Sequence, residues 1–564
     1  MCAKYTRAVI DYSQIYGQAP PGQPFDLLKS YPTDLILVRL ARINTIIYLQ
    51  PNILLQNMRI FKEAIFEGVE GADDLVPQLM QLFDRKDSIV FSGQVMSAII
   101  KDAMEHYVPA ASPPDLRQFG KDFFQAILAY NEHFYDQDLT MTSFADLFTI
   151  NIQQQFYLRR ETYLKLTTLF KFAFISRFLS EDEKLKAPSR VYCQALEIAT
   201  VWDLARFILH IFNVVYSGDR ESRHILDRHG AQWPVLEQFV VKKTDLVDAP
   251  LSLHKQVVPK PLYELDDGSL VLLDYNYFTY GLDQGIFYSL YNKSSLRDGH
   301  IFKNYNEYKA YLGLKYFEEY YVGRFIHKIF CKWNHTIIHT EKYQDYIVRA
   351  GNQVLIFEIK MTEFNVNGLD HGSFDDFKTF IDQNFLAFKQ SGQKAKGLGQ
   401  LFRQIGHLAR EQELLDLLSI KNPKRLQIYP IIVYSDANLD INGVNEYVNE
   451  TWAGHTVLYA GTFSAIRPVT MINGSFFMTY YHLLRKDPVL FGQWLNDYIR
   501  SVNNLKKRYR KDKNPIDYLE YNRSFAGHMR RKIPKDDFDQ NLTAIQVDFD
   551  LEVKDFRLNP QVLK

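Results

Sequence analysis

The chain has 564 residues, 66 Lys and Arg balance 66 Asp and Glu, and 46% of its residues are hydrophobic. This composition excludes a chain that is mainly disordered, collagen-like or coiled-coil. The neutral total charge excludes a protein that coats nucleic acid through a general basic excess, so any nucleic-acid contact must come from local patches. The length predicts roughly three to four globular domains.

The cysteines and the apolar stretches indicate a cytoplasmic protein. Cys2, Cys193 and Cys331 are isolated, which favours neither a disulfide framework nor a thiolate zinc site. The start of the chain lacks the continuous apolar segment of a signal peptide. The most apolar later stretch, 198–216, is interrupted by charged residues, which favours a buried helix over a membrane span. We therefore expect a soluble, cytoplasmic protein with no membrane partner.

Residues 1–240 are predicted to form an all-α domain with a sensing or regulatory role. Apolar residues recur there at spacings of three and four, the period of an amphipathic helix. Polar or proline-containing breaks separate the segments. The expected helices cover residues 34–49, 78–82, 93–104, 118–130, 144–170 and 195–216.

Residues 241–300 are predicted to form a small β-rich connector. Two β-rich runs flank Asp266, Asp267 and Gly268, and these turn residues are typical of a hairpin.

Residues 301–490 are predicted to form an α/β domain, because a helix, three short strands, a helix and another strand follow one another. Residues 491–564 are expected to be a helical, basic extension. The expected elements are a helix over 304–330, strands over 336–343, 345–350 and 353–360, a polar excursion over 362–388, a helix over 392–413, strands over 426–436 and near 467–472, and a helix from 476 toward 502.

The strongest chemical signal is a hairpin within this domain. Gly351 and Asn352 suit a two-residue turn. Counting outward from that turn sets Asp345 opposite Glu358, with Cβ atoms roughly 4.5–5.5 Å apart. Lys360 shares their face, because side chains alternate along a strand. Two acids and one lysine therefore converge.

Opposed carboxylates repel each other unless something neutralises them. A hard divalent cation does so, and Mg²⁺ usually takes one or two carboxylates together with water and phosphate oxygens. Hydrolysis of a phosphodiester needs such a metal to activate water and to neutralise developing charge. We expect Lys360 to hold the attacking water or to stabilise that charge.

The flanking helices add candidates. Glu318 shares its helix face with Leu314, Tyr321 and Phe325, and a carboxylate on an apolar stripe needs a metal or an ion pair to offset its burial. On the downstream helix, Lys396, Gln400 and Gln404 repeat every fourth residue and would face the water, the lysine or a substrate phosphate, or else form an ordinary solvated face.

This pattern resembles the PD-(D/E)xK, or restriction-endonuclease-like, nuclease superfamily. The resemblance implies a central mixed sheet flanked by helices, with Asp345 and Glu358 as ligands of Mg²⁺ or Mn²⁺. It also implies that Lys360 is the catalytic lysine, that Glu318 is the carboxylate of the preceding helix, and that Gln400 is the polar residue of the following one.

The resemblance covers about residues 305–440. Gly313 and Phe317 precede Glu318 in a GxxxFE-like context, whereas Gln344 stands where the family's name places proline. By analogy with the superfamily, the expected function is metal-dependent cleavage of DNA, favoured over RNA. A bacterial restriction or anti-phage role is the expected setting, with a second copy of the chain or a partner defence protein as the expected protein partner.

Other patterns leave alternatives open. Lys506, Lys507, Arg508 and Arg510 surround Tyr509 in a basic run that would contact phosphates, as would Lys396 and Gln404. A second (D/E)xK spacing, with Asp539, Glu552 and Lys554, lacks a glycine-containing turn and is rejected as a site.

Two competing functions remain. The motif of Arg223, His224 and His229 resembles that of the all-α HEPN ribonucleases. Alternatively, the domain is a non-catalytic nucleic-acid-binding or assembly module with a nuclease-like fold, in which the acidic face is a structural ion pair.

Overall fold

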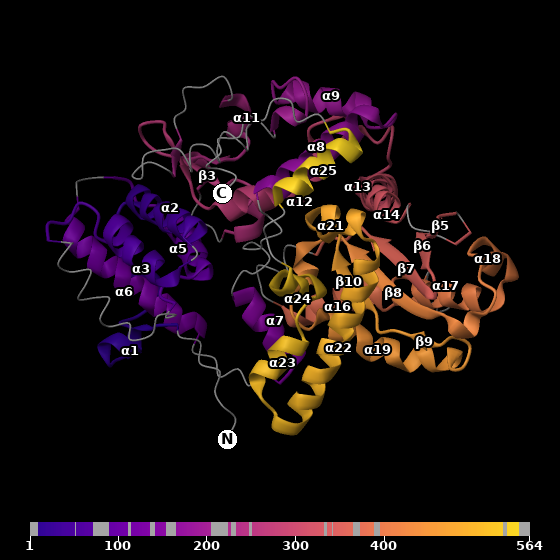
Figure 1. Ribbon diagram of the computed structural model, residues 1–564. Coiled ribbons are helices and arrows are strands. Elements are labelled where there is room, and N and C mark those ends of the chain that lie inside the picture. Colours follow the sequence, from indigo (N-terminus) through magenta and orange to yellow (C-terminus); the bar gives the residue numbers. More distant parts are fainter. Residues whose placement is uncertain are drawn as a thin grey trace.

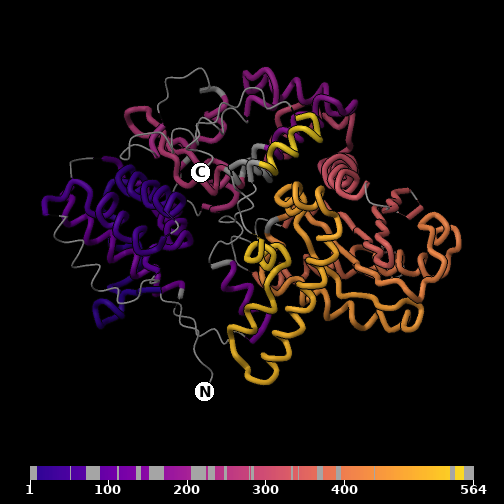
Figure 2. Tube along the Cα trace, in the orientation of Figure 1, coloured from indigo at the N-terminus to yellow at the C-terminus, as the bar shows by residue number. Residues whose placement is uncertain are grey.

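The computed structural model shows a mixed α and α/β protein with a helical body on one side and a strand-rich body on the other (Figure 1). The chain trace in Figure 2 shows the yellow C-terminal segment returning beside the purple helix of residues 165–181. The structure describes residues 9–50, 52–71, 89–110, 114–135, 142–153, 165–204, 224–226, 233–246, 251–331, 335–340, 342–343, 345–364, 373–388, 395–533 and 538–551.

The N-terminal helices pack around an apolar core in which Leu37, Leu40, Ile99 and Ile127 are fully buried. The helices expected over 34–49, 93–104 and 118–130 are confirmed, while 78–82 lies outside the described residues. The elements are α1 (Tyr12–Tyr16), η1 (Pro24–Leu27), α2 (Thr33–Leu49), α3 (Ile53–Ile60), η2 (Phe61–Ile65), α5 (Gly93–Glu105) and α6 (Leu116–Tyr135).

Two of the later helix predictions need correction. The helix expected over 144–170 appears as α7 (Phe144–Gln153) and α8 (Lys165–Glu181), and the residues between them are not described. The helix expected over 195–216 does not begin at residue 195, because α9 (Lys186–Ala195) ends there and buries Tyr192 and Cys193. Residues 205–216 lie outside the described part of the chain.

A small four-stranded sheet follows, in the order β1-β4-β3-β2. The predicted hairpin is confirmed, because Leu262 pairs with Leu272 and Glu264 with Leu270. One strand of this sheet, β1, comes from within the segment expected to be all-α. The elements are β1 (Ile225–Leu226), α11 (Trp233–Glu237), β2 (Val240–Val241), η4 (Lys243–Asp245), η5 (Leu253–Val257), β3 (Leu262–Glu264), β4 (Leu270–Leu272), α12 (Tyr275–Asn292) and η6 (Ser295–Asp298).

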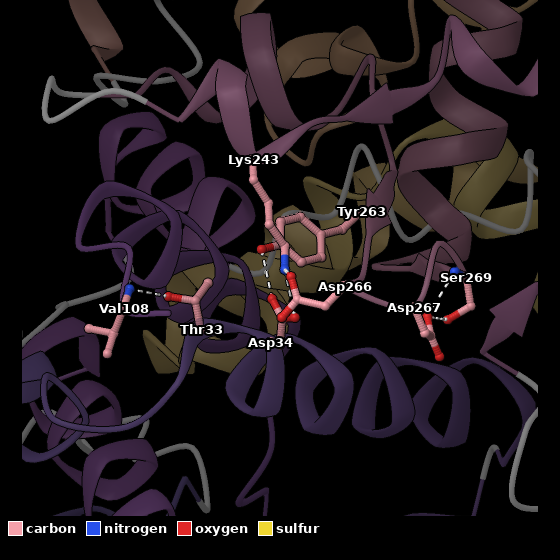
Figure 3. Close-up of polar contacts among 8 residues, drawn as sticks. All are labelled: Thr33, Asp34, Val108, Lys243, Tyr263, Asp266, Asp267 and Ser269. Atoms are coloured by element: carbon pink, nitrogen blue, oxygen red, sulfur yellow. Dashed lines mark hydrogen bonds and ion pairs between the residues drawn. The ribbon is translucent and has the colours of Figure 1, made fainter. Parts of the chain in front are cut away.

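Polar contacts join this sheet to the start of α2 (Figure 3). The Lys243 ammonium lies 2.8 Å from the Asp34 carboxylate and also pairs with Asp266. The Tyr263 hydroxyl donates to the same Asp34 carboxylate at 2.9 Å. The helical body is therefore attached to the connector through a partly buried charge network.

A long helix then leads into the second body, as expected for 304–330. It is α-helical in α13 (Tyr305–Leu312) and α14 (Arg324–Phe330), but between them η7 (Gly313–Gly323) is a π-helix. Because a π-helix bonds residue i to i+5, the expected four-residue face shifts: Glu318 and Tyr321 are buried, whereas Leu314 is 45% exposed.

The second body contains a six-stranded mixed sheet, in the order β10-β8-β7-β6-β5 with β9 beside β8. Strands β5, β6 and β7 are antiparallel neighbours, while β8 and β10 run parallel to β7. The predicted turn register is confirmed, because Ala350 pairs with Gln353. The strands are β5 (Thr336–Ile338), β6 (Tyr346–Ala350), β7 (Gln353–Lys360), β8 (Gln427–Tyr434), β9 (Ala465–Ile466) and β10 (Thr470–Asn473).

Helices cover both faces of this sheet. Val354 and Ile356 pack into the core that contains α17, whereas Leu355 and Phe357 pack into the core that contains η7 and α14. The segment expected as a polar excursion, 362–388, contains a helix, α16. The helices on this part are α16 (Phe374–Phe385), α17 (Leu398–Arg410), α18 (Gln412–Leu417), η8 (Pro423–Arg425), η9 (Ala437–Asp440), α19 (Val444–Thr456) and η10 (Val457–Tyr459).

The C-terminal helices pack into the same core as the sheet rather than apart from it. Ile545 and Phe549 are fully buried, and the Phe549 ring lies 5.1 Å from that of Phe174 on α8. The helix expected from 476 toward 502 is divided into three. The helices are α20 (Ser475–Thr479), α21 (Tyr481–Lys486), α22 (Val489–Asp512), α23 (Pro515–Tyr521), α24 (Phe525–Lys532) and α25 (Phe538–Phe549).

The outer edge of β10 is bonded to side chains of α19. The Asn449 amide accepts from the Val469 N–H and donates to the Val469 carbonyl, both at 2.8 Å. The Asn445 amide oxygen accepts from the Met471 N–H at 2.8 Å. Within the described segments, no helix has the length and apolar character needed to cross a membrane.

Candidate active site

Asp345 stands at the start of β6, one residue outside the antiparallel ladder. The last ladder pair is Tyr346 with Phe357, so the register continues to Asp345 opposite Glu358. The Asp345 carboxylate accepts a hydrogen bond from the Ile359 N–H at 2.6 Å. Its backbone has a φ of +31°. Residues other than glycine rarely adopt a positive φ, and those that do cluster at functional sites.

Glu358 and Lys360 lie on the same face of β7, as predicted. The Glu358 side chain is 2% exposed, and its Oε1 atom forms an ion pair with Lys360 Nζ. Burial raises the pKa of Glu358 well above its usual value, and the Asp345 carboxylate adds to the increase while Lys360 opposes it. Burial alone would lower the pKa of Lys360, but Glu358 and Asp345 together raise it. The three groups therefore form one electrostatic unit.

Glu318 reaches this unit from η7. Its pKa is raised to about 7, first by burial and also by the Asp345 carboxylate, while His339 opposes the shift. The π-helix passes close to β6 at Gly323, where an added Cβ would lie 2.1 Å from the Tyr346 hydroxyl. Glycine at this position thus permits the approach that brings Glu318 to Asp345. π-Helical segments frequently occur at functional sites.

His339 is a member of the site that the sequence analysis missed. Its Nε2 atom lies 3.6 Å from Glu318 Oε1. It follows directly after β5, and continuing the pairing of Ile338 with Ile347 sets His339 opposite Tyr346. The two rings stack with centroids 4.2 Å apart. The register of β5 could have revealed this pair, but no tight turn links β5 to β6, so the sequence does not determine that register.

Of the polar row predicted on the downstream helix, Gln400 and Gln404 lie on α17 and Lys396 does not. Lys396 is exposed and precedes α17, and its N–H bonds to the Ala387 carbonyl. The Gln400 side chain accepts from the Gly397 N–H at 3.3 Å, so it caps the helix. Gln404 is buried on the helix that packs on β7, and its Oε1 atom has no hydrogen-bond partner among the described residues.

Gly397 explains why the helix starts later than predicted. It has φ +54°, and an added Cβ would lie 2.4 Å from the Phe385 carbonyl oxygen. The close approach to the end of α16 therefore requires glycine just before Leu398, and it places Lys396 outside the helix.

The predicted basic run lies at the end of α22 and is partly neutralised. Lys506 pairs with Glu446, and Arg508 pairs with Asp517. Lys507 and Arg510 are exposed. Tyr509, expected to stack on a base, packs instead between Tyr518 and Tyr521, with ring centroids 5.1 and 5.7 Å away.

The acidic residues of the site suit the expected cation only in part. Among the described residues, no three His, Cys, Asp or Glu side chains already stand as a metal-binding group. Mg²⁺, however, requires only one or two protein carboxylates, with water or phosphate completing its shell. Asp345 and Glu358 supply two buried carboxylates that repel each other, so the residues suit a hard divalent cation.

Several candidates from the sequence lie outside the described residues, namely Arg223, His229, Gln344, Glu552 and Lys554. His224 is described and is buried, and burial lowers its pKa to about 3, with Arg42 adding to the decrease. No protein-family model, curated protein or solved structure matches the chain.

Proposed function

We propose that this chain is a metal-dependent nuclease that hydrolyses phosphodiester bonds. The observation that carries the proposal is the buried unit at the ends of β6 and β7, where Asp345 and Glu358 stand beside Lys360. Burying like charges is costly without a compensating cation. The strain at Asp345 and the π-helix at Glu318 add independent support.

Each residue of the site has a proposed role that follows from its position. Asp345 and Glu358 would hold Mg²⁺ or Mn²⁺, and Glu318 completes the acidic cluster. A bound Mg²⁺ supplies charge neutralisation and a more acidic water. The Lys360 side chain is 25% exposed and pairs with Glu358. If Glu358 instead bound the cation, Lys360 would be released to contact a substrate phosphate or the attacking water. Burial of the carboxylates strengthens each of these interactions.

The substrate and setting are proposed by analogy. DNA is favoured over RNA, and a bacterial restriction or anti-phage role follows from the combination with a helical N-terminal body. That body would sense or regulate, and the partly buried network around Lys243 would link it to the rest of the chain. Exposed Lys507 and Arg510 would add phosphate contacts away from the site.

The test is cleavage of circular duplex DNA, single-stranded DNA and RNA with Mg²⁺, with Mn²⁺ and with chelator. Metal-dependent cleavage is expected in the wild type, undetectable cleavage in Glu358→Gln, and a loss of about 100-fold or more in Lys360→Ala. Glu446→Gln is the matched control, because Glu446 forms another buried Glu–Lys pair, with Lys506. Cleavage that survives both site variants would exclude this site.

A second candidate, a non-catalytic binding module, is favoured by one observation. The ion pair of Lys360 with Glu358 already offsets part of the buried negative charge without a cation. In that case Mn²⁺ would not raise the melting temperature, since only a ligand that binds the folded state stabilises it. A rise in melting temperature that is absent from Glu358→Gln would support the nuclease instead.

A further inference from the structure

His339 occupies a distinct place in the site, because its side chain is more exposed than those of Glu318, Glu358 and Lys360. Its side chain is 30% exposed, whereas that of Glu318 is 12% exposed. The His339 Nε2 atom lies 3.6 Å from Glu318 Oε1. His339 is therefore in a position to influence where that carboxylate points.

The His339 ring is itself held in place. It lies almost flat on Tyr346, with an interplanar angle of 11° and ring centroids 4.2 Å apart. Tyr346 is fixed from two other directions, by Gly323 against its hydroxyl and by the edge of the His327 ring, whose centroid is 5.6 Å away. Residues from β6 and from the helix η7–α14, together with the end of β5, therefore hold the His339 ring next to Glu318.

We propose that His339, clamped on Tyr346, is a positioning residue that holds the Glu318 carboxylate toward Asp345. This inference rests on the proposed function, because it assigns Glu318 to the cation site. Groups that orient metal ligands typically change metal affinity or activity by about 10- to 100-fold when they are removed. A partly exposed His–Glu pair, by contrast, contributes little to stability. The two roles therefore predict different results.

The test measures binding of Mn²⁺ alone to the full-length protein by calorimetry, with melting temperature as a second readout. His339→Ala is expected to weaken Mn²⁺ binding by about 10-fold or more while changing the melting temperature of the metal-free protein little. His339→Gln is expected to recover part of the affinity, because its amide N–H can donate to Glu318. Tyr346→Leu, which removes the stacking surface, should weaken binding in the same direction as His339→Ala.

A matched control is available on α17, where His407 Nδ1 lies 2.5 Å from Glu411 Oε1. His407→Ala removes a comparable His–Glu pair and should leave Mn²⁺ affinity unchanged. If cleavage is measurable, His339→Ala should lower kcat while leaving KM for DNA nearly unchanged, since it does not itself hold the substrate.

The outcomes separate this inference from the proposed function. The inference alone would be overturned if the wild type binds Mn²⁺ and the variants His339→Ala, His339→Gln and Tyr346→Leu bind it with the same affinity. Wild type that binds no Mn²⁺ would overturn the metal-dependent function and the inference with it. If His339→Ala does not fold, the Gln and Leu variants decide, and unchanged affinity in both would overturn the inference.

Discussion

The carboxylate of Asp345 accepts a hydrogen bond from the backbone N–H of Ile359, the residue between Glu358 and Lys360. This contact ties the acid of one strand to the backbone of the next at the point where the ladder ends. Asp345 also has a positive φ, and the hydrogen bond to its carboxylate can offset the cost of that backbone strain. Geometry and charge at the candidate site are therefore coupled through one side chain.

Replacing Asp345 with asparagine should separate those two effects. Asparagine keeps an oxygen that can accept from Ile359 and tolerates positive φ, but it removes the charge. We expect Asp345→Asn to fold with at least wild-type stability, because a like-charge repulsion is removed, and to lose Mn²⁺ binding and metal-dependent cleavage. Melting curves and the cleavage assay measure both properties. Asp345→Val, which is β-branched, should instead destabilise the fold by about 1–3 kcal/mol.

Adding a methyl group at Gly323 should push the π-helix away from β6. In Gly323→Ala the new Cβ meets the Tyr346 hydroxyl and the Glu318 carbonyl, and such overpacking costs about 1–3 kcal/mol. We expect a lower melting temperature and weaker Mn²⁺ binding. Gly323→Ala with Tyr346→Phe removes the clashing hydroxyl and should recover part of the stability. Failure of the double variant to recover any stability would show that the clash with Tyr346 is not the cause.

Asp436 should make stability depend on pH between about 4 and 7. It is buried after β8 and accepts from the N–H groups of Phe364 and Asn438. Burial raises its pKa to about 6, against the hydrogen bonds that lower it. The folded protein therefore binds this proton more tightly than the unfolded chain. The resulting stabilisation is fully present below the unfolded pKa of 3.8 and is lost as the pH rises through about 6.

The measurement is the difference in melting temperature between wild type and Asp436→Asn at several pH values. A shift of one pKa unit corresponds to about 1.4 kcal/mol. Between pH 4 and pH 7 the free energy of unfolding of the wild type should therefore fall by on the order of 2–3 kcal/mol relative to that of the variant. Asp267→Asn is the control, because hydrogen bonds from the Ser269 hydroxyl and N–H lower the pKa of exposed Asp267. A constant difference across this range would refute the assignment to Asp436.

Removing the Lys243 ammonium should loosen the helical body from the small sheet. Lys243→Met leaves Asp34 and Asp266 without their shared cation, and the partly exposed network contributes about 1 kcal/mol. We expect faster hydrogen exchange at the start of α2 and in β3, with little change in the six-stranded sheet. Lys242→Met is the neighbouring control, because Lys242 pairs with Glu237. Equal exchange in both variants would argue against a local attachment.

The sequence correctly predicted those parts of the fold whose geometry is determined by a local signal. The turn at Gly351 and Asn352 set the register of β6 and β7, and the register in turn set the faces of Glu358 and Lys360. The helix α16 was missed although Phe377, Ile381 and Phe385 follow a helical period, because the surrounding residues are strongly polar. Local patterns therefore predicted the strands better than the helices around them.

The remaining features depend on contacts between distant segments. The helix around Glu318 is π-helical and approaches Tyr346 at Gly323, and no residue spacing reveals either feature. His339 reaches the site through the register of β5, a strand joined to β6 by no short turn. Lys396 was wrongly placed on the same helix as Gln400 and Gln404, because α17 begins only after the close approach of Gly397 to Phe385. Propensity cannot supply such long-range constraints.

Two asparagine side chains occupy backbone groups at one edge of the six-stranded sheet. Asn449 occupies both backbone groups of Val469, and Asn445 occupies the N–H of Met471. An edge strand with unpaired backbone groups is a template for strand addition and aggregation. These groups in and just before β10 are already bonded, so they are not available to a strand of a second molecule.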